Sequence, residues 1–342
     1  MTADRQHHPQ FLVTGATGFI GRRVVRQLLA DFGAQAVVCL VKAPATSLEA
    51  TALESFRTSG LRLIQGDLMA AAVADRPAPK VDVVFHLAAN IDTDASEDEL
   101  RVNHIGTGHL LDWLKPVVSG ARIVYASSVA VHDRDREPAG PIDEDSPLVA
   151  RTAYGRTKLL GEEIIRRRAA ADGYSWTIAR LPTVYGPGQK AGGLFEQLIQ
   201  LASIGALLGR IEWPGRTSII HVDDVAAVMI ALSQRNDVAG ETYCIASESP
   251  TVGELSQRIA RVIHRPRVPL AIPGPVLALL RWIVWSRTAG RFVPRSARLA
   301  FWRLSLIVSD GFWFDTSKFR RVYEKPLRSL EQGGLSDLAR DL

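Results

Sequence analysis

The sequence predicts an α/β fold built on a doubly wound parallel sheet. Short, continuous apolar runs alternate with amphipathic stretches through the first half of the chain, and a glycine-rich loop joins the first run to the first amphipathic stretch. Strands covered by helices on both faces have uninterrupted apolar runs of this kind. Beyond Gly186 the alternation loosens, which indicates a second, smaller lobe.

Each strand and helix is predicted from its own pattern. Strands are expected in the apolar runs at 11–15, 36–42, 61–67, 81–89, 121–128 and 175–186. Helical periodicity covers 99–114 and the stretch RRVVRQLLADFG, which a glycine closes. Residues 218–234 are expected to return to the main sheet.

The predicted boundaries follow the change in pattern. The first domain is expected to cover 1–186 plus about 216–240, and a discontinuous substrate-binding lobe to cover 187–215 and 241–342. The apolar segment 269–294 contains VLALLRWIVW, which is too short for the roughly 20 residues of a membrane span. We interpret it as lobe core or as a lid over the substrate, in preference to contact with a membrane surface.

Composition narrows the functional classes. The 342 residues are 46% hydrophobic and 23% charged, which is ordinary for a globular protein. The formal net charge of +5 comes without a Lys/Arg tract interleaved with aromatics, so we expect no nucleic-acid partner; the excess suits anion attraction or a membrane-facing patch. Cys39 and Cys244 match no metal-ligand spacing, and the polar N-terminus lacks a secretory run, so we expect no metal and a cytoplasmic location.

The loop VTGATGFIG carries the first candidate site. Gly15, Gly18 and Gly21 follow the first strand and open the first helix, where backbone N–H groups and the helix dipole face a pyrophosphate. A glycine-rich turn without a ligand is the alternative, and the placement between strand and helix disfavours it. The loop residues expected to contact a dinucleotide are Gly15, Thr17, Gly18, Phe19, Ile20 and Gly21.

The end of the second strand bears on the choice of cofactor. An acidic side chain there would bind the adenine-ribose hydroxyls and repel a 2′-phosphate, but Val41 occupies the position and Lys42 follows it. Arg22 and Arg23 lie just past the glycine loop. These cations favour NADP(H), with NAD(H) as the alternative if they are only solvated surface charges.

Further cofactor contacts are expected at the ends of the third and fourth strands. Asp67 is placed to accept a hydrogen bond from the adenine amino group or to cap the next helix, and Leu68 follows it. Ala88 and Ala89 end the fourth strand, where small side chains leave room for a dinucleotide; core packing explains them equally well.

The motifs TGATGFIG, GDL, DVVFHLAA, VNHIGT, VYASS, YGRTK, RLPTVYGPG and HVDDVA occur in this order between about 11 and 245. The chain resembles the extended short-chain dehydrogenase/reductase family, which includes the NAD(P)-dependent epimerases and dehydratases and the 3-beta-hydroxysteroid dehydrogenase-like proteins. The resemblance implies a Rossmann-type domain, a nicotinamide cofactor and a Ser/Tyr/Lys active site. It also implies a homodimer formed through the helix that carries the Tyr/Lys pair and the helix before it, with a monomer as the alternative.

Chemistry supports the catalytic residues that the resemblance implies, which are Ser128, Tyr154 and Lys158. Tyr154 and Lys158 are four residues apart and share one face of a helix. A nearby ammonium is expected to lower the pKa of the tyrosine toward neutral pH, so that it can move a proton. Ser128 ends the fifth strand, where its hydroxyl can polarise a carbonyl. Ser127 is the competing serine, but the resemblance selects Ser128.

The resemblance assigns further roles. Lys158 would also hold the nicotinamide ribose, and Pro182, Thr183 and Val184 would lie near the nicotinamide amide. Asn103 is a candidate for the cofactor site or a proton relay, although we rate it structural first. Arg180 and Asp224 are interpreted as scaffold residues.

The reaction within the family is less constrained. No carboxylate follows Ser128, which disfavours dehydration, and the apolar segment 269–294 favours oxidoreduction of a bulky apolar small-molecule substrate, such as a steroid-like, polyketide or acyl compound. The alternative is a nucleotide-sugar epimerase that retains NAD. The residues available to it for a diphosphate and a base are Arg210, Arg216, Arg281, Arg287 and Trp213. A third hypothesis is a non-catalytic NADP(H)-binding protein.

Overall fold

The computed structural model describes residues 9–92, 95–132, 140–189, 193–203, 207–264, 268–286, 298–310 and 312–331. The chain divides into two compact units. Unit 1 comprises Met1–Val131, Ala150–Arg180 and Val222–Tyr243, and unit 2 comprises His132–Val149, Leu181–His221 and Cys244–Leu342. These boundaries differ from the predicted ones chiefly in giving 132–149 and 181–186 to unit 2.

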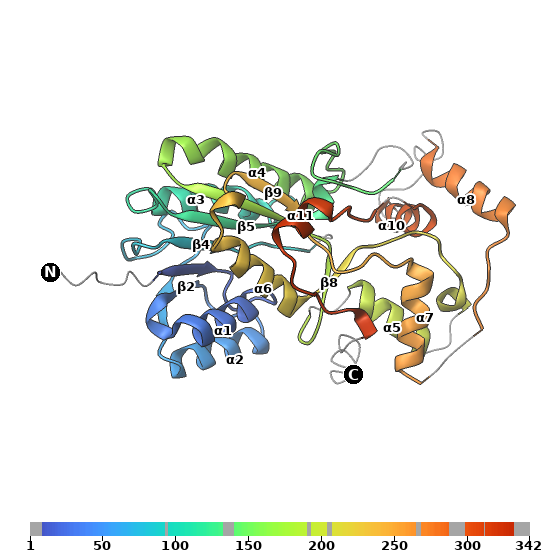
Figure 1. Cartoon of the computed structure of the whole chain (residues 1–342), viewed down its shortest axis with the longest axis horizontal. Coiled ribbons are helices and arrows are strands. Elements are labelled where there is room, and N and C mark those ends of the chain that lie inside the picture. Colours follow the sequence, from blue (N-terminus) through green and yellow to red (C-terminus); the bar gives the residue numbers. More distant parts are fainter. Residues whose placement is uncertain are drawn as a thin grey trace. The chain divides into compact units, whose positions relative to one another are not determined.

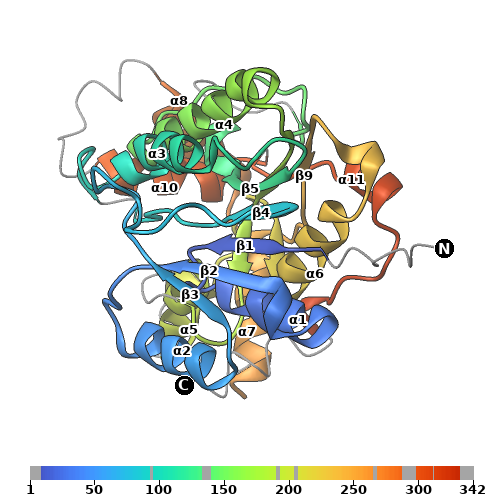
Figure 2. The ribbon, with the colours of Figure 1, turned by 90° about the vertical axis from the view of Figure 1, so that its left-hand side faces the viewer.

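Unit 1 is built on the main sheet, whose strand order is β3-β2-β1-β4-β5-β6-β9; Figure 2 labels each of these strands except β6. The pairings of β1 with β2 and β4, of β2 with β3, and of β4 with β5 are all parallel. This confirms the predicted fold class, with a Rossmann-type order. The strands are β1 (Phe11–Thr14), β2 (Val37–Val41), β3 (Arg62–Gln65), β4 (Val83–His86), β5 (Arg122–Ser128), β6 (Ser175–Leu181) and β9 (Glu241–Cys244).

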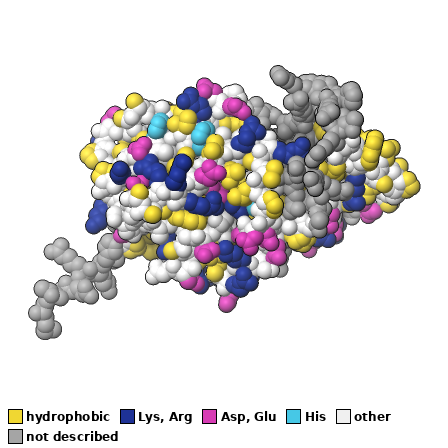
Figure 3. Space-filling model, turned by 90° about the horizontal axis from the view of Figure 1, so that it is seen from above, with side chains coloured by type: hydrophobic (Ala, Val, Ile, Leu, Met, Phe, Trp, Pro, Cys, Tyr) yellow, Lys and Arg dark blue, Asp and Glu magenta, His cyan; other side chains and the backbone are white. Residues whose placement is uncertain are grey.

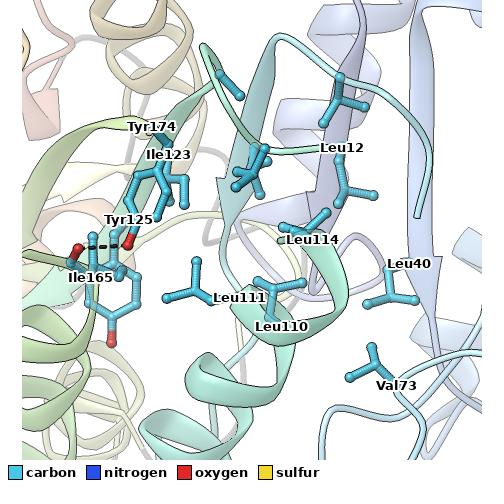
Figure 4. Close-up of a cluster of buried hydrophobic side chains, with 14 of the residues drawn as sticks. Leu12, Leu40, Val73, Leu110, Leu111, Leu114, Ile123, Tyr125, Ile165 and Tyr174 are labelled. Atoms are coloured by element: carbon cyan, nitrogen blue, oxygen red, sulfur yellow. Dashed lines mark hydrogen bonds between the residues drawn. The ribbon is translucent and has the colours of Figure 1, made fainter. Parts of the chain in front are cut away.

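Helices cover both faces of this sheet (Figures 1 and 2). One face carries α1 (Gly21–Phe32), α2 (Ser47–Thr58) and α6 (Val222–Ser233); the other carries α3 (Ile105–Leu114) and α4 (Ala153–Asp172). The core beneath α3 and α4 brings leucines of α3 against β1, β4 and β5 (Figure 4). Short 3-10 helices span Ala34–Ala36, Arg101–Asn103, Val129–His132, Leu207–Arg210 and Asn236–Val238.

Unit 2 has its own core and its own small sheet. Strands β7 (Thr183–Tyr185) and β8 (Ile219–His221) pair in parallel. Helices α5 (Leu194–Ser203) and α7 (Val252–Val262) pack around them through a buried cluster that includes Tyr185, Phe195 and Leu255. The remaining helices are α8 (Gly274–Trp285), α10 (Arg298–Val308) and α11 (Ser317–Val322). None of the helices in the described part of the chain combines the length and hydropathy needed to cross a bilayer.

The prediction that 218–234 returns to the main sheet is wrong for its strand. Strand β8 pairs with β7, and β9 is the last strand of the main sheet. Pro182 explains the separation, because it directly follows β6 and has no N–H to donate to a continuing ladder. Only the helical part of the segment, α6, belongs to unit 1.

The interpretation of 269–294 as lobe core is also wrong for α8. Val284 is the only buried residue of this helix. Leu279 and Trp282 expose 56% and 66% of their surfaces. Residues 287–294 lie outside the described part of the chain.

Candidate active site

The glycine loop is held against the end of β4 in a conformation that requires glycine. Gly15 has a φ of +66°, and a side chain added to it would lie 2.7 Å from the backbone nitrogen of Ala88. A side chain at Gly21 would lie 2.1 Å from the carbonyl oxygen of Gly15. The loop therefore packs backbone against backbone, which a side chain at either glycine would prevent.

The start of α1 fits an anionic ligand. No side chain caps this N-terminus at Ile20, and its first turn contains no acidic residue. Arg22 and Arg23 occupy that turn; Arg23 donates to Asp223 at 3.3 Å and lies over the ring of Phe19. Burial lowers the pKa of Arg22, and the neighbouring charges of Arg23 and Arg26 lower it further. The backbone N–H groups of Arg22 and Arg23 already donate to the carbonyls of Gly18 and Ile20, so the attraction for a phosphate group comes from the positive end of the helix dipole and from this crowding of positive charge.

The other residues predicted for the adenine side lie at the carboxyl ends of β2, β3 and β4. Val41 is buried and Lys42 is exposed. Asp67 is exposed and accepts from the backbone nitrogen of Met69 at 2.9 Å, so it caps a turn, while Leu68 is buried. Ala88 and Ala89 are half-buried beside the loop, as is Thr17 within it. Their contacts with a cofactor remain predictions.

Ser128 and Tyr154 are brought together by a close approach of α4 to the end of β5. A side chain on Gly155 would lie 2.3 Å from the carbonyl oxygen of Ala130, so only glycine allows the helix to begin here. The Thr152 hydroxyl caps the helix by accepting from the Gly155 nitrogen at 3.0 Å. The resulting geometry brings Tyr154 close enough to Ser128 for that side chain to lower the pKa of the Tyr154 hydroxyl.

Lys158 lies deep in unit 1, with 2% of its surface exposed. Its ammonium nitrogen sits 4.1 Å from the centre of the Tyr125 ring. Burial lowers the pKa of Lys158 to about 7, and the negative charge of Glu162 opposes this shift. Gly161 makes room for the arrangement, since a side chain there would lie 2.3 Å from the Tyr125 hydroxyl.

Glu162 is the functional candidate that the sequence reasoning missed. It is fully buried one turn after Lys158 and pairs with Arg180 at 2.9 Å and with Arg166 at 2.7 Å. Ser127 donates a hydrogen bond to the same carboxylate. Burial by itself raises the pKa of Glu162, but Arg180, Arg166 and Ser127 outweigh it and hold the pKa below its usual value. The signal in the sequence that could have identified Glu162 is its i, i+4 spacing to Lys158, which places the two residues on one face of the helix.

These contacts separate the two serines. Ser127 is buried and engaged by Glu162, whereas Ser128 lies at the strand end beside Tyr154 and accepts from the Ala130 nitrogen at 3.2 Å. Arg180, interpreted from sequence as scaffold, is the main partner of Glu162.

The expected lowering of the Tyr154 pKa is wrong for this structure. Burial raises the pKa of Tyr154, and the hydrogen bond from Ser128 opposes that rise only in part. Since the pKa of Lys158 falls to about 7, the lysine is only partly charged near neutral pH. Both shifts have one cause, because burial disfavours the charged form of each group.

Asn103 and His86 fix the surroundings of the site. The Asn103 amide accepts from the Asn90 nitrogen at 2.8 Å and donates to the Asn90 oxygen and to Thr157 of α4. His86 contacts the hydroxyls of Thr14 and Thr107, and burial lowers its pKa to about 3, so it is neutral. The Asn103 amide thus ties a strand-end segment to the active-site helix; its contact with cofactor remains a prediction.

The predicted nicotinamide-amide segment belongs to unit 2. Pro182 is buried, and Thr183 and Val184 form β7 with Tyr185. The Thr183 nitrogen donates to the Ser218 oxygen at 3.2 Å. Ser128, at the end of β5, and Tyr154 and Lys158, both on α4, thus all lie in unit 1, whereas 182–184 belong to unit 2.

Comparison with known proteins gives a consistent family. Residues 11–246 match the model of the NAD dependent epimerase/dehydratase family. The ceramide reductase of Caulobacter vibrioides is 31% identical over 77% of this chain and 73% of its own length. The sterol demethylase protein B of Methylococcus capsulatus is 28% identical over 91% of each chain.

A solved structure extends the likeness to the fold of nearly the whole chain. The UDP-glucuronic acid 4-epimerase from Bacillus cereus, in complex with UDP-glucuronic acid and NAD, superposes with a TM-score of 0.71 at 21% identity and covers 97% of this chain and 98% of its own. The family match confirms the resemblance drawn from the motifs. The chain is an enzyme of the NAD-dependent epimerase/dehydratase family.

Proposed function

We propose that this enzyme interconverts a carbonyl and a secondary alcohol on a bulky apolar substrate, preferentially as an NADPH-dependent reductase. The bound nicotinamide would supply the hydride. Ser128 donates a hydrogen bond to the carbonyl oxygen, and Tyr154 transfers its hydroxyl proton to the alkoxide that forms. Lys158 holds the nicotinamide ribose and, when charged, stabilises the phenolate left behind.

The protonation state of Tyr154 supports the reductive direction. A tyrosine with a raised pKa is protonated at neutral pH, which is the form that a general acid needs. Lys158, with a pKa of about 7, can pass between its two forms as the tyrosine loses and regains its proton.

The single observation that most favours an apolar substrate concerns the arginines that an epimerase would use. Arg210 donates to the Val268 oxygen and Arg281 to the Val308 oxygen, at 3.2 Å and 2.8 Å. Arg216 pairs with Asp310 at 3.4 Å. Each described candidate for a diphosphate contact is therefore engaged by unit 2 itself, and Arg287 lies outside the described residues.

Trp213 follows the same pattern. Its indole nitrogen donates to the Leu208 oxygen at 3.1 Å, and its ring packs against the buried cluster of unit 2. The relatives named for ceramide reduction and sterol demethylation add support, because their names refer to large apolar compounds. The non-catalytic hypothesis is set aside by the family match.

Preference for NADP(H) rests on the cations near the adenine ribose. Lys42 is exposed directly after β2, and Val41 leaves no carboxylate to repel a 2′-phosphate. We expect Lys42→Glu to weaken NADPH binding about tenfold with little change for NADH, because a charge-assisted contact is lost. Lys80→Glu, at an exposed lysine before β4, is the matched control.

The decisive experiment combines cofactor extraction with turnover. Protein stripped of any ligand is titrated with NADPH and NADH, and NADPH oxidation is then followed with ketones of long-chain or polycyclic type. Tyr154→Phe should bind NADPH normally and lose activity by about 10²–10⁴-fold. Tightly retained NAD together with conversion of UDP-sugars, without net cofactor turnover, would instead establish the epimerase.

A further inference from the structure

Helix α8 presents an apolar surface that nothing in the described part of unit 2 covers. Val276, Leu279 and Trp282 expose 48%, 56% and 66% of their surfaces. Their spacing of three residues places them along one side of the helix, which we call the α8 face. Hydrophobic side chains gather at the right-hand end of the view in Figure 3, where α8 lies.

The opposite side of α8 is fixed within unit 2. Helix α10 packs against it, and Val284 is buried. Arg281 donates to the Val308 oxygen, and the indole of Trp285 donates to Ser309 at 2.7 Å. The helix is thus anchored by one side. The α8 face is exposed although the rest of the helix is packed in place. A helix that is apolar on all sides normally buries all of them, so the α8 face calls for a partner.

Charge identifies the partner. Residues 255–309 contain ten arginines and no Asp, Glu or Lys. The rest of the chain has 31 basic residues against 36 acidic ones, so the whole net charge of +5 originates in this one segment. An apolar helix within an acid-free, arginine-rich segment has the composition of an interfacial membrane anchor.

We propose that the α8 face docks the enzyme on an anionic lipid bilayer, with α8 lying in the interface. Twelve residues are too few to span, but Trp282 and Leu279 can enter the headgroup boundary, and the net positive charge of residues 255–309 attracts anionic headgroups. A second copy is a poorer occupant. A twofold interface would place the same patch on both sides and so bring two acid-free segments together.

The test is co-sedimentation of the full chain with vesicles of phosphatidylcholine alone or with 30% phosphatidylglycerol (about one lipid in three, enough for a strong surface potential). Neither cofactor nor substrate is needed, so the result is independent of the proposed reaction. We expect binding to the anionic vesicles that falls with added salt. The double variant Leu279→Ala/Trp282→Ala should bind at least about tenfold more weakly, because two interfacial side chains are truncated.

Leu48→Ala is the matched control, since Leu48 is a comparably exposed leucine (51%) on α2 and should leave binding unchanged. Quenching of Trp282 by brominated lipid, lost in Trp282→Phe, reports insertion directly. Equal binding of the double variant, or no binding by the parent chain, overturns the proposal. A dimer in sedimentation velocity that the double variant dissociates, without vesicle binding, identifies a second copy as the occupant and also overturns it.

Discussion

Helices α4 and α8 violate the usual rule of burial in opposite ways. Helix α4 is rich in charge, yet it buries Lys158 and Glu162 almost completely. Helix α8 contains a single charged residue, yet it leaves Leu279 and Trp282 more than half exposed. Ionised groups rarely lie fully buried unless paired, and contiguous apolar side chains are rarely left in water.

The comparison shows how each departure is supported by its surroundings. On α4, Arg180 and Arg166 neutralise Glu162, so that a buried carboxylate remains ionised beside Lys158. On α8, contacts with α10 hold the packed side in place, but nothing in the described part of unit 2 covers the α8 face. The buried charge of α4 is neutralised by side chains of the protein itself. The exposed apolar side chains of α8 would instead need a binding partner to cover them. Both places are where we locate function.

The largest expected effect comes from removing the buried carboxylate. Glu162→Gln should lower the free energy of unfolding by about 3–5 kcal/mol, because Arg180 would be left buried without its ionised partner. Urea unfolding measures the change. Activity should fall with it, and the pKa of Lys158 should drop further, because Glu162 opposes its downward shift.

Glu163→Gln is the control for this substitution, as Glu163 is the exposed neighbour on the same helix. It should change the free energy of unfolding by less than about 0.5 kcal/mol. Similar effects of the two substitutions would mean that the Glu162 ion pairs add nothing to the free energy of unfolding. The buried charge of α4 would then need no compensation, and the contrast with α8 would fail.

The second effect is smaller and depends on pH. The pKa of Lys158 is lowered from 10.5 to about 7 by burial, so between these values the unfolded chain binds more protons than the folded one. Lys158 therefore destabilises the fold fully below pH 7, and the penalty disappears as the pH rises toward 10.5. Lys158→Met should be more stable than the parent at pH 7, with an advantage that shrinks by about 2 kcal/mol by pH 9.

Urea unfolding at the two pH values tests this, with Lys115→Met at an exposed lysine as the control. Because the control keeps Lys158, its difference in unfolding free energy from the parent chain should be the same at both pH values. A constant advantage of Lys158→Met across this range would show that the lysine retains an ordinary pKa in the fold.

Local sequence patterns were sufficient to predict the strands of the main sheet from β1 to β6, although not β9. Each strand from β1 to β5 lies within its predicted run, because continuous apolar strands have no other stable placement than between two layers of helices. The position of Tyr154 and Lys158 on one face of α4 follows from helix geometry alone. The choice of Ser128 over Ser127 came from the family resemblance, and Gly155 explains physically how the start of α4 approaches the end of β5.

What escaped prediction depends on distant residues. Arg180 is eighteen positions from Glu162, and only the fold brings them together. The direction of the Tyr154 shift also failed, because spacing supplies the neighbouring lysine but not the burial that dominates both pKa values. On α8, an apolar pattern was equally compatible with a buried and an exposed helix, since composition does not reveal which neighbours are present.

The smallest effect tests the α8 side of the comparison. Leu279→Ala should change the free energy of unfolding by less than about 0.5 kcal/mol, because its side chain already lies in water. Val284→Ala removes less from the opposite side of the same helix, yet should destabilise by about 1–2 kcal/mol, because those atoms are buried. Urea unfolding of both variants decides the matter. If the larger loss came from Leu279, the α8 face would already be covered in solution, and a lid or a second copy would replace the bilayer as its occupant.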